Sequence, residues 1–283
     1  SMTAGGNAYP ITNGYPVLIP FEQSVLSEEE VKALASPISR DTYRGIRKAM
    51  KDLVSPSNAK MVEHLAVISS ELAQHAEPAR VLVVGGASLG RGLEPFYARK
   101  DIGVVAFDVY ASPCVQFVAD AHYIPVADAC FDAVVVQMVL EHVLDARRVV
   151  SEIHRVLKPA GLVYATTPFL LNVHEGAYDF TRFTESGLRY LFKDFELIRS
   201  GALAGVGTQL LWALDGFGKG VFRSRMAGKL MKVLFCWLRR FDRLTPEAYN
   251  IASAAEVYFW GRKSEHTLAP KAAIDHYQGA QRK

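Results

Sequence analysis

The sequence is poor in cysteine, and its cysteines lie far apart. Cys114, Cys130 and Cys236 are the only three among 283 residues, and no two of them form a CxxC pair. This spacing excludes a disulfide framework and a cysteine-based zinc site, and it predicts reduced thiols. The start of the sequence shows no cleavable signal peptide, so we expect a cytoplasmic protein.

Long apolar runs, a large net charge and internal repeats are absent as well. The longest hydrophobic runs are shorter than the roughly 20 residues that a membrane-spanning helix needs. The formal net charge of +3 is too small to indicate nucleic-acid binding. His64, His75, His122 and His154 do not have the spacing of metal ligands, so no metal site is predicted.

Short hydrophobic runs alternate with helical segments in the middle of the chain. Five such runs cover residues 81–84, 104–107, 117–119, 133–136 and 162–166. Continuous runs of this kind are typical of parallel strands, whose two faces are both covered by helices. A helix with an apolar face occupies residues 145–157, and two further strands are predicted at 195–200 and 256–260. The pattern predicts an α/β fold.

The two ends of the chain are expected to lie outside this pattern. Residues 1–55 are rich in glycine, proline and serine and predict an N-terminal arm with a short helix near 27–35. A longer helix is predicted from a Ser57 cap through Leu72. We therefore expect a main domain over residues 56–263 and a polar, frayed tail over 264–283.

A glycine-rich loop follows the first strand of the predicted sheet. Gly85, Gly86 and Gly90 lie where the backbone must turn tightly and approach a ligand. Asp108 ends the second strand, where a carboxylate accepts hydrogen bonds from ribose hydroxyls. These two features fit S-adenosylmethionine and a nicotinamide dinucleotide equally well.

The residues that follow resemble one family. Three successive segments are similar to motifs of class I S-adenosylmethionine-dependent methyltransferases of type 11. The acidic segment on the adenine side matches residues 120–128, and the "FD-V" and "LEHV" segments match residues 131–143. The "E-RVLKPGG" signature matches residues 152–161. The resemblance covers about residues 81–169. It implies a Rossmann-like fold with a seven-stranded, mostly parallel sheet, an antiparallel last strand and a helical insertion, at about residues 205–250, between strands six and seven. It also implies S-adenosylmethionine as cofactor, bound by Gly85, Gly86, Ala87, Ser88, Gly90, Asp108, Val109, Asp120, Ala121, Gln137, Met138 and His142.

The loop departs from the family pattern at the end that binds methionine. Val83 stands where the family usually has an acidic residue, two positions before the first glycine, and Ala87 replaces the second glycine. The amino group of the methionine must therefore find another partner, for which the Gly85 carbonyl and Gln137 are candidates.

Residues 167–184, directly after the fifth strand, mix polar and aromatic side chains. They resemble a loop of bacterial methyltransferases associated with cell-envelope polysaccharide gene sets. Because a hydroxyl acceptor needs a base, we assign this role to His174, with Asp179 orienting it or binding acceptor hydroxyls and Arg182 anchoring an anionic or sugar group. In the alternative interpretation, Asp179 and Arg182 form an ion pair that locks the loop, and His174 caps the turn. His142 is expected to make a structural hydrogen bond beside the cofactor.

Residues 219–243 contain eight basic residues and one acidic residue, Asp242. A basic amphipathic helix with aromatic residues is typical of membrane interfaces. In the alternative interpretation, the apolar stripe packs over the sheet as a lid and the charges face water. The stripe consists of Met226, Leu230, Val233, Leu234, Trp237 and Phe241.

Residues 9–20 resemble the end of the zinc-ribbon domain of tRNA-methyltransferase activator proteins, but the cysteines of such a ribbon are absent here.

The leading functional hypothesis is O-methylation of a sugar or glycolipid hydroxyl by a cytoplasmic enzyme, and contact with the inner membrane through residues 219–243 is the alternative to the lid. The partner is then a small-molecule or glycan acceptor, not a nucleic acid. A small aromatic or isoprenoid acceptor is the alternative among enzymes. From another class, a non-catalytic S-adenosylmethionine-binding protein is favoured by Val83. The oligomeric state is not predicted.

Overall fold

The computed structural model describes residues 2–4, 7–12, 14–33, 58–90 and 92–282. Its centre is a seven-stranded sheet in the order β10-β11-β9-β8-β5-β6-β7. β11 runs antiparallel to both of its neighbours, and the pairs among β5 to β9 are parallel. The predicted Rossmann-like sheet with an antiparallel last strand is confirmed. The strands are β5 (Ala79–Val84), β6 (Ile102–Asp108), β7 (Phe117–Val118), β8 (Phe131–Gln137), β9 (Leu157–Pro168), β10 (Phe195–Ala204) and β11 (Glu256–Lys263).

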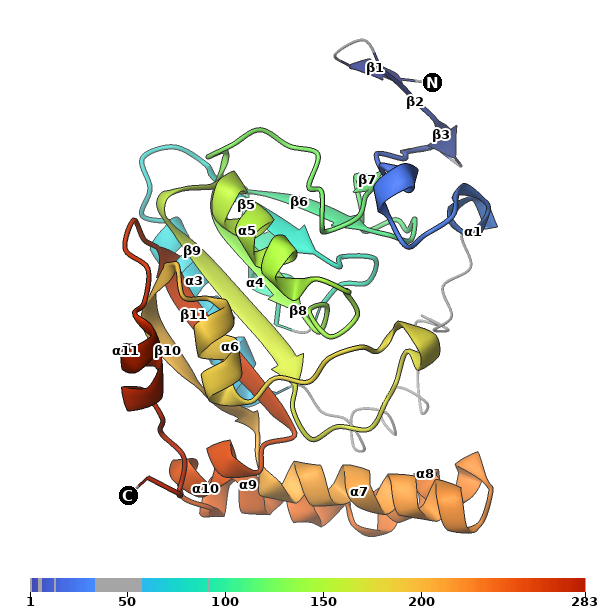
Figure 1. The fold of residues 1–283 in the computed structure, drawn as a ribbon, viewed down its shortest axis with the longest axis vertical. Helices are drawn as coiled ribbons and strands as arrows, with labels where there is room; N and C mark the ends of the chain where they lie inside the picture. Colours follow the sequence, from blue (N-terminus) through green and yellow to red (C-terminus); the bar gives the residue numbers. More distant parts are fainter. Residues whose placement is uncertain (1, 5–6, 13, 34–57, 91, 283) are drawn as a thin grey trace.

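Helices cover both faces of the sheet, as the continuous apolar strands require. α5 (Ala146–Val156) and α6 (Glu185–Leu191) lie on the near face in Figure 1, and α3 (Ala59–Leu72) and α4 (Glu94–Ala98) lie behind the sheet. Side chains of β5 alternate between two buried clusters: Leu82 and Val84 pack with α5, whereas Val81 and Val83 pack with α3. The core therefore has two layers, one on each side of the sheet.

The order of strands reverses beside β5. The chain proceeds from β5 to β6 and β7 on one side, and then crosses to β8 on the other. At such a switch point the loops that follow the two central strands diverge, and a crevice forms at their carboxyl ends. The fold therefore places the loops after β5 and β8 around one site.

The N-terminal arm packs against the β7 edge of this sheet. Val17 pairs with Val118 in parallel, and the Leu18 amide donates to the Val118 carbonyl at 2.8 Å. Val17 and Ile19 are buried there together with Val31 of α1. The arm's remaining elements are β1 (Met2–Ala4), β2 (Asn7–Tyr9), β3 (Ile11–Thr12), β4 (Tyr15–Pro16), η1 (Phe21–Gln23) and α1 (Glu28–Ala33).

Two sequence-based boundaries differ from the structure. The N-cap of α3 is Asn58, whose side chain accepts from the Met61 amide, and Ser57 lies outside the described residues. The polar tail is not frayed over its described part, because α11 (Pro270–Asp275) packs on α6 and His276 Nε2 lies 2.6 Å from Glu185 Oε1.

The insertion between β10 and β11 is a group of helices rather than one amphipathic helix. α7 (Val206–Val221) packs against α8 (Arg225–Leu234), and Ser224 caps α8 after the break. Asp242 accepts from the Gly207 and Thr208 amides and so caps the N-terminus of α7. Both helices run along one end of the molecule (Figure 1). The insertion is completed by η3 (Cys236–Arg240), α9 (Phe241–Leu244) and α10 (Glu247–Ala252). Across the described part of the chain, no helix combines the length and apolarity that spanning a bilayer demands.

Candidate active site at the carboxyl ends of the strands

The glycine loop after β5 is shaped by close packing against the β8 loop. Gly85 has a φ of 75°, and a Cβ atom there would lie 2.3 Å from Val139 Cγ2. A Cβ at Gly90 would lie 2.2 Å from Gln137 Oε1. Glycine is therefore required at Gly85, where φ is positive, whereas a side chain at Gly90 would need the Gln137 side chain to move.

A small cavity of about 150 Å³ lies beside this loop. Seven of the twelve predicted cofactor residues line it: Gly85, Asp108, Val109, Asp120, Ala121, Met138 and His142. Asp108 is buried, and its oxygens accept from the Ala87 amide at 2.9 Å and the Tyr110 amide at 3.2 Å. The cavity thus combines apolar walls with a carboxylate at the end of β6.

A larger cavity of about 600 Å³ adjoins the first. Val84, Gly85 and Met138 line both cavities, so the two meet where β5 and β8 end. The predicted residues Ser88, Gly90 and Gln137 lie in the larger cavity, together with parts of α3, α7 and η3. Gly86 and Ala87 line neither cavity.

Met138, at the junction, has an unusual backbone. Its φ is 53°, and its amide donates to the Thr166 carbonyl at 2.9 Å. A non-glycine residue in this region is strained by about 1 kcal/mol or more, and such strain concentrates at functional sites. The strained turn directs the chain from β8 into Glu141 and His142.

The sequence did not reveal that the N-terminal arm contributes to the small cavity. Val25 and Leu26 line it, and the Ser24 hydroxyl donates to Asp120. The other Asp120 oxygen accepts from the His122 amide at 2.9 Å. Burial acts to raise the pKa of Asp120, but the hydrogen bonds from His122 and Ser24 hold it below its usual value. The only sequence signal was the apolar patch at residues 15–20.

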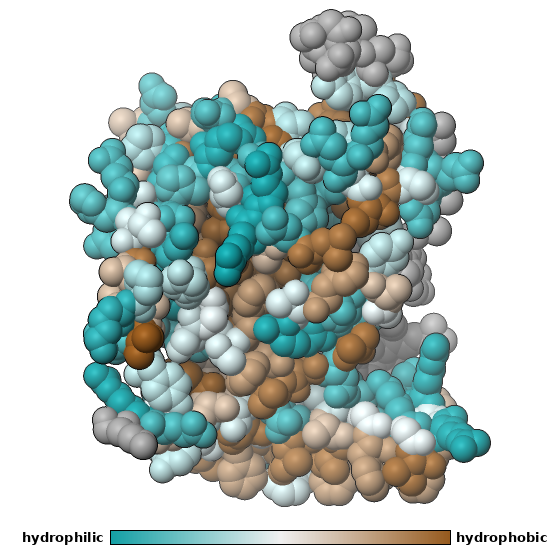
Figure 2. Space-filling view, in the orientation of Figure 1, coloured by the Kyte–Doolittle hydropathy of each residue, from teal (hydrophilic) through white to brown (hydrophobic). Residues whose placement is uncertain are grey.

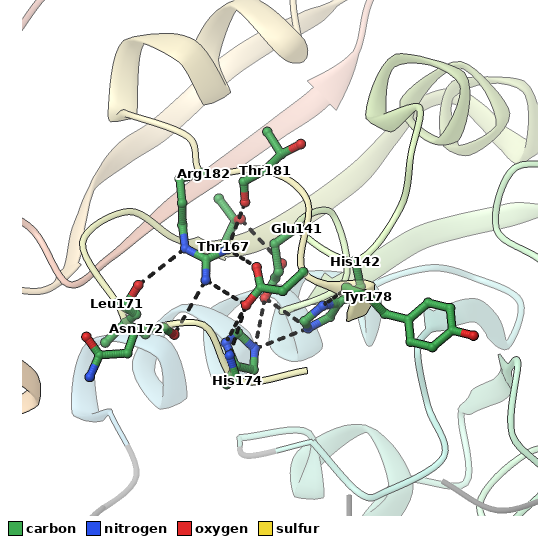
Figure 3. Close-up of polar contacts among 10 residues, drawn as sticks. Glu141, His142, Thr167, Leu171, Asn172, His174, Tyr178, Thr181 and Arg182 are labelled. Atoms are coloured by element: carbon green, nitrogen blue, oxygen red, sulfur yellow. Dashed lines mark hydrogen bonds and ion pairs between the residues drawn. The ribbon is translucent and has the colours of Figure 1, made fainter. Parts of the chain in front are cut away.

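The loop after β9 brings His174 against Glu141 and His142 (Figure 3). The two Nε2 atoms of His142 and His174 are 3.1 Å apart, and Glu141 Oε1 lies 3.6 and 3.7 Å from them. Glu141 is completely buried, and its Oε1 has no hydrogen-bond partner among the described residues. Burial raises the pKa of Glu141 to about 8. Sequence reasoning missed Glu141.

Asp179 orients His174 and also locks the loop. Its Oδ2 accepts from the His174 amide at 3.0 Å and lies 3.4 Å from His174 Nδ1. Arg182 binds both Asp179 oxygens, and its other donors reach backbone carbonyls of the same loop. Although burial acts in the opposite direction, hydrogen bonds from Arg182 and the His174 amide lower the pKa of Asp179 to about 2. The Asp179–Arg182 ion pair of the alternative interpretation is therefore present, and the catalytic roles of His174 and Asp179 stay predictions.

Burial favours the neutral forms of the two histidines in this cluster. Burial lowers the pKa of His142 and of His174. His142 Nδ1 lies 2.8 Å from the Tyr178 carbonyl, which only accepts, so Nδ1 carries the proton and Nε2 presents its lone pair.

Comparison with known proteins assigns one part of this framework. Residues 97–165 match a methyltransferase domain. The matched segment contains Asp108, Asp120, Met138, Glu141 and His142, but neither the glycine loop nor His174. No curated protein matches the chain.

Solved structures of similar shape have low sequence identity to this chain. Phosphoethanolamine N-methyltransferase 2 of Haemonchus contortus, solved with S-adenosylhomocysteine, is 16% identical with a TM-score of 0.48; the match covers 80% of this chain and 59% of that one. A 1,6-didemethyltoxoflavin-N1-methyltransferase of Burkholderia thailandensis is 18% identical with a TM-score of 0.45 and coverages of 81% and 94%. Likeness at this level carries no information on the substrate.

Proposed function

We propose that the protein is an S-adenosylmethionine-dependent methyltransferase that methylates a hydroxyl of a sugar or glycolipid. The observation that carries this proposal is the overlap between the matched methyltransferase domain and the double cavity. Asp108, Asp120 and Met138 belong to the matched segment and also line the cavities. Ligands of open α/β sheets bind at this place, beyond the carboxyl ends of the strands.

The small cavity fits the nucleoside part of the cofactor. Its apolar walls, which include Phe107 and Val139, would contact the adenine, and Asp108 would accept from the ribose. The methionine part would extend past Gly85 into the larger cavity, where Ser88 and Gln137 offer polar groups in place of the acidic residue missing at Val83. When bound, the cofactor supplies a methyl group activated by its sulfonium.

The acceptor hydroxyl must lose a proton as it attacks the methyl group, and we assign this task to the cluster around His174. His174 is the most accessible member, since 30% of its side chain is exposed while none of the Glu141 side chain is. Asp179 faces its other ring nitrogen. Arg182 is a positioning residue in this proposal, because its donors are directed at Asp179 and at backbone carbonyls rather than at an acceptor.

Two other functions are alternatives: an observation in the larger cavity favours the first, and the surroundings of Glu141 disfavour the second. Apolar side chains such as Trp212 in the larger cavity would also suit an aromatic or isoprenoid acceptor. A non-catalytic cofactor-binding protein is disfavoured by the buried Glu141 oxygen, since a group without a partner is costly unless it serves a purpose.

The proposed acceptor includes lipid-linked glycans because the insertion exposes an apolar surface. Met226, Leu230 and Leu244 are 70%, 56% and 74% exposed, so they do not pack over the sheet as a lid. Hydrophobic residues gather along this end of the molecule in Figure 2. Exposed basic residues, including Arg225 and Lys229, accompany them and suit anionic headgroups.

Sedimentation with anionic vesicles tests the membrane contact. We expect binding at low salt that weakens at high salt and is reduced in Leu230→Ser, but not in Ile274→Ser, which removes an even more exposed side chain from α11. Equal binding by the two variants would contradict a contact through the insertion.

Transfer of an isotopically labelled methyl group tests the reaction itself. The protein is incubated with methyl-labelled S-adenosylmethionine and a panel of methyl glycosides, alkyl glycosides, phenols and isoprenoid alcohols. The proposal predicts base-stable ether-linked label on a glycoside. Label on phenols or isoprenoid alcohols alone would contradict it and support the alternative acceptor.

A further inference from the structure

Three atoms with lone pairs converge in the cluster around His174. The Nε2 atoms of His142 and His174 are 3.1 Å apart, and Glu141 Oε1 completes a triangle at 3.6 and 3.7 Å. The three side chains come from two loops and point toward one another in Figure 3. They form a compact group at the edge of the small cavity, which His142 lines.

The surrounding hydrogen bonds direct the protons away from the centre of this triangle. His142 Nδ1 donates to the Tyr178 carbonyl at 2.8 Å. His174 Nδ1 faces Asp179, which is ion-paired with Arg182 and therefore acts as an acceptor. With the His174 proton on Nδ1, on the side of Asp179, each neutral ring presents a bare Nε2. Glu141 Oε1 is buried without a partner among the described residues. Two imidazole nitrogens and one carboxyl oxygen face one another, an arrangement that a cation between them would satisfy by binding the ionised form of Glu141.

The dimensions of the triangle match a metal site. A point equidistant from its three corners lies about 2.0 Å from each, which is the distance at which Zn²⁺ binds imidazole nitrogen and carboxylate oxygen. Two histidines and one glutamate are a ligand set of catalytic zinc sites, which leave a fourth position open. The Tyr178 carbonyl and Asp179 occupy the outer positions that usually orient metal-binding histidines.

We propose that Glu141, His142 and His174 bind a divalent transition-metal ion, with Zn²⁺ as the best fit, and that its open position receives the acceptor oxygen. The second part rests on the proposed methyltransferase function. The ion would polarise the acceptor hydroxyl, so that its O–H bond breaks and the proton passes to water. As the new O–CH₃ bond forms, the methyl–sulfur bond of S-adenosylmethionine breaks, giving S-adenosylhomocysteine and one proton per turnover. His174 would then hold the ion through Nε2 and would not itself accept the proton, which the polarised hydroxyl gives up to water.

Zinc binding to the full chain, without an affinity tag and after treatment with a chelator, tests the site directly. Calorimetric titration with Zn²⁺ should reveal one site. His174→Ala and His142→Ala should weaken it by about 100-fold or more, and Asp179→Asn by about 10- to 100-fold through its effect on His174. His266→Ala, which removes an exposed histidine elsewhere, should leave it unchanged. Circular dichroism checks that the variants are folded.

Visible absorption of bound Co²⁺ provides a second readout that reports the coordination itself. The wild type should show the strong bands of a four-coordinate ion, and Glu141→Gln should change them while His266→Ala does not. Absence of a Zn²⁺ site, or equal Zn²⁺ binding by wild type and His174→Ala, would overturn the inference.

The failure of this inference is distinguishable from that of the proposed function. A protein that binds S-adenosylmethionine but no Zn²⁺ would refute the metal site and leave the methyltransferase proposal in place. A protein that binds Zn²⁺ but no S-adenosylmethionine would refute the methyltransferase proposal and leave the metal site in place.

Discussion

Two buried glutamates of the matched domain, Glu152 and Glu141, have opposite surroundings. Glu152 accepts from the Ile124 amide at 2.9 Å and from Arg155 at 2.9 and 2.8 Å. Glu141 accepts a long hydrogen bond from the Thr167 hydroxyl at 3.4 Å, and its Oε1 has no partner in the described part of the chain. Burial acts to raise the pKa of both, but Arg155 and the Ile124 amide reverse this effect at Glu152 alone.

The contrast separates a structural glutamate from a functional one. Arg155 also binds Asp128 and the carbonyls of Ile124 and Val126, so the Glu152–Arg155 pair holds the turn that precedes β8. This pairing gives the "E-RVLKPGG" signature a structural explanation. At Glu141 the chain tolerates a buried acceptor at a cost to stability, as expected where a ligand or proton completes the group.

The largest expected effect is on turnover in Glu141→Gln. An amide at this position can neither ionise nor accept a proton, so the rate should fall by about 100-fold or more, since proton removal typically contributes 10²–10⁴. Formation of S-adenosylhomocysteine with the acceptor found in the labelling experiment measures it. Glu152→Gln is the matched control and should keep the rate within about threefold. Equal rates in the two variants would remove the functional distinction.

The second-largest expected effect is a loss of stability when Glu152, rather than Glu141, is replaced. Glu152→Ala should lower the free energy of unfolding by about 2 to 3 kcal/mol, since the Ile124 amide and part of Arg155 lose their partner. Urea denaturation measures this loss. Glu141→Gln should leave the free energy of unfolding unchanged or raise it, and a greater loss in Glu141→Gln than in Glu152→Ala would reverse the comparison.

The smallest expected effect is the pH dependence of the stabilisation that Glu152 provides. The pKa of Glu152 is lowered in the folded state, so its contribution to stability is present above its unfolded value of 4.5 and is lost as pH falls through the folded value. The difference in unfolding free energy between wild type and Glu152→Gln should therefore shrink as pH falls from about 6 to about 3. A difference that is constant over this range would show that the carboxylate is not preferentially stabilised in the folded protein.

The sequence predicted those parts of the fold that depend on local patterns. The apolar runs that became β5 and β8 are continuous because both faces of each strand are buried. Glycine at Gly85 is enforced by its positive φ and by Val139 of the adjoining loop. Features that join distant segments left no such pattern. Ser24 binds Asp120 across 96 positions, and His142 meets His174 across 32.

The insertion shows a different limit. The apolar spacing from Met226 to Phe241 continues through η3, so periodicity alone did not show that the helices break and re-form. Sequence spacing was also a poor guide to the candidate metal site. Its members come from two loops, after β8 and after β9, so the absence of ligand spacing among four histidines did not exclude it.

Calorimetric titration with S-adenosylmethionine tests the central claim most directly. We predict one site with a dissociation constant below about 1 mM, weakened at least about tenfold in Asp108→Asn, which alters the carboxylate at the cavity end of β6. Asp101→Asn, a half-exposed aspartate just before the opposite end of the same strand, is the control and should bind as the wild type does. Absence of binding by the folded wild-type protein, or equal binding by Asp108→Asn and Asp101→Asn, would contradict the proposed cofactor site.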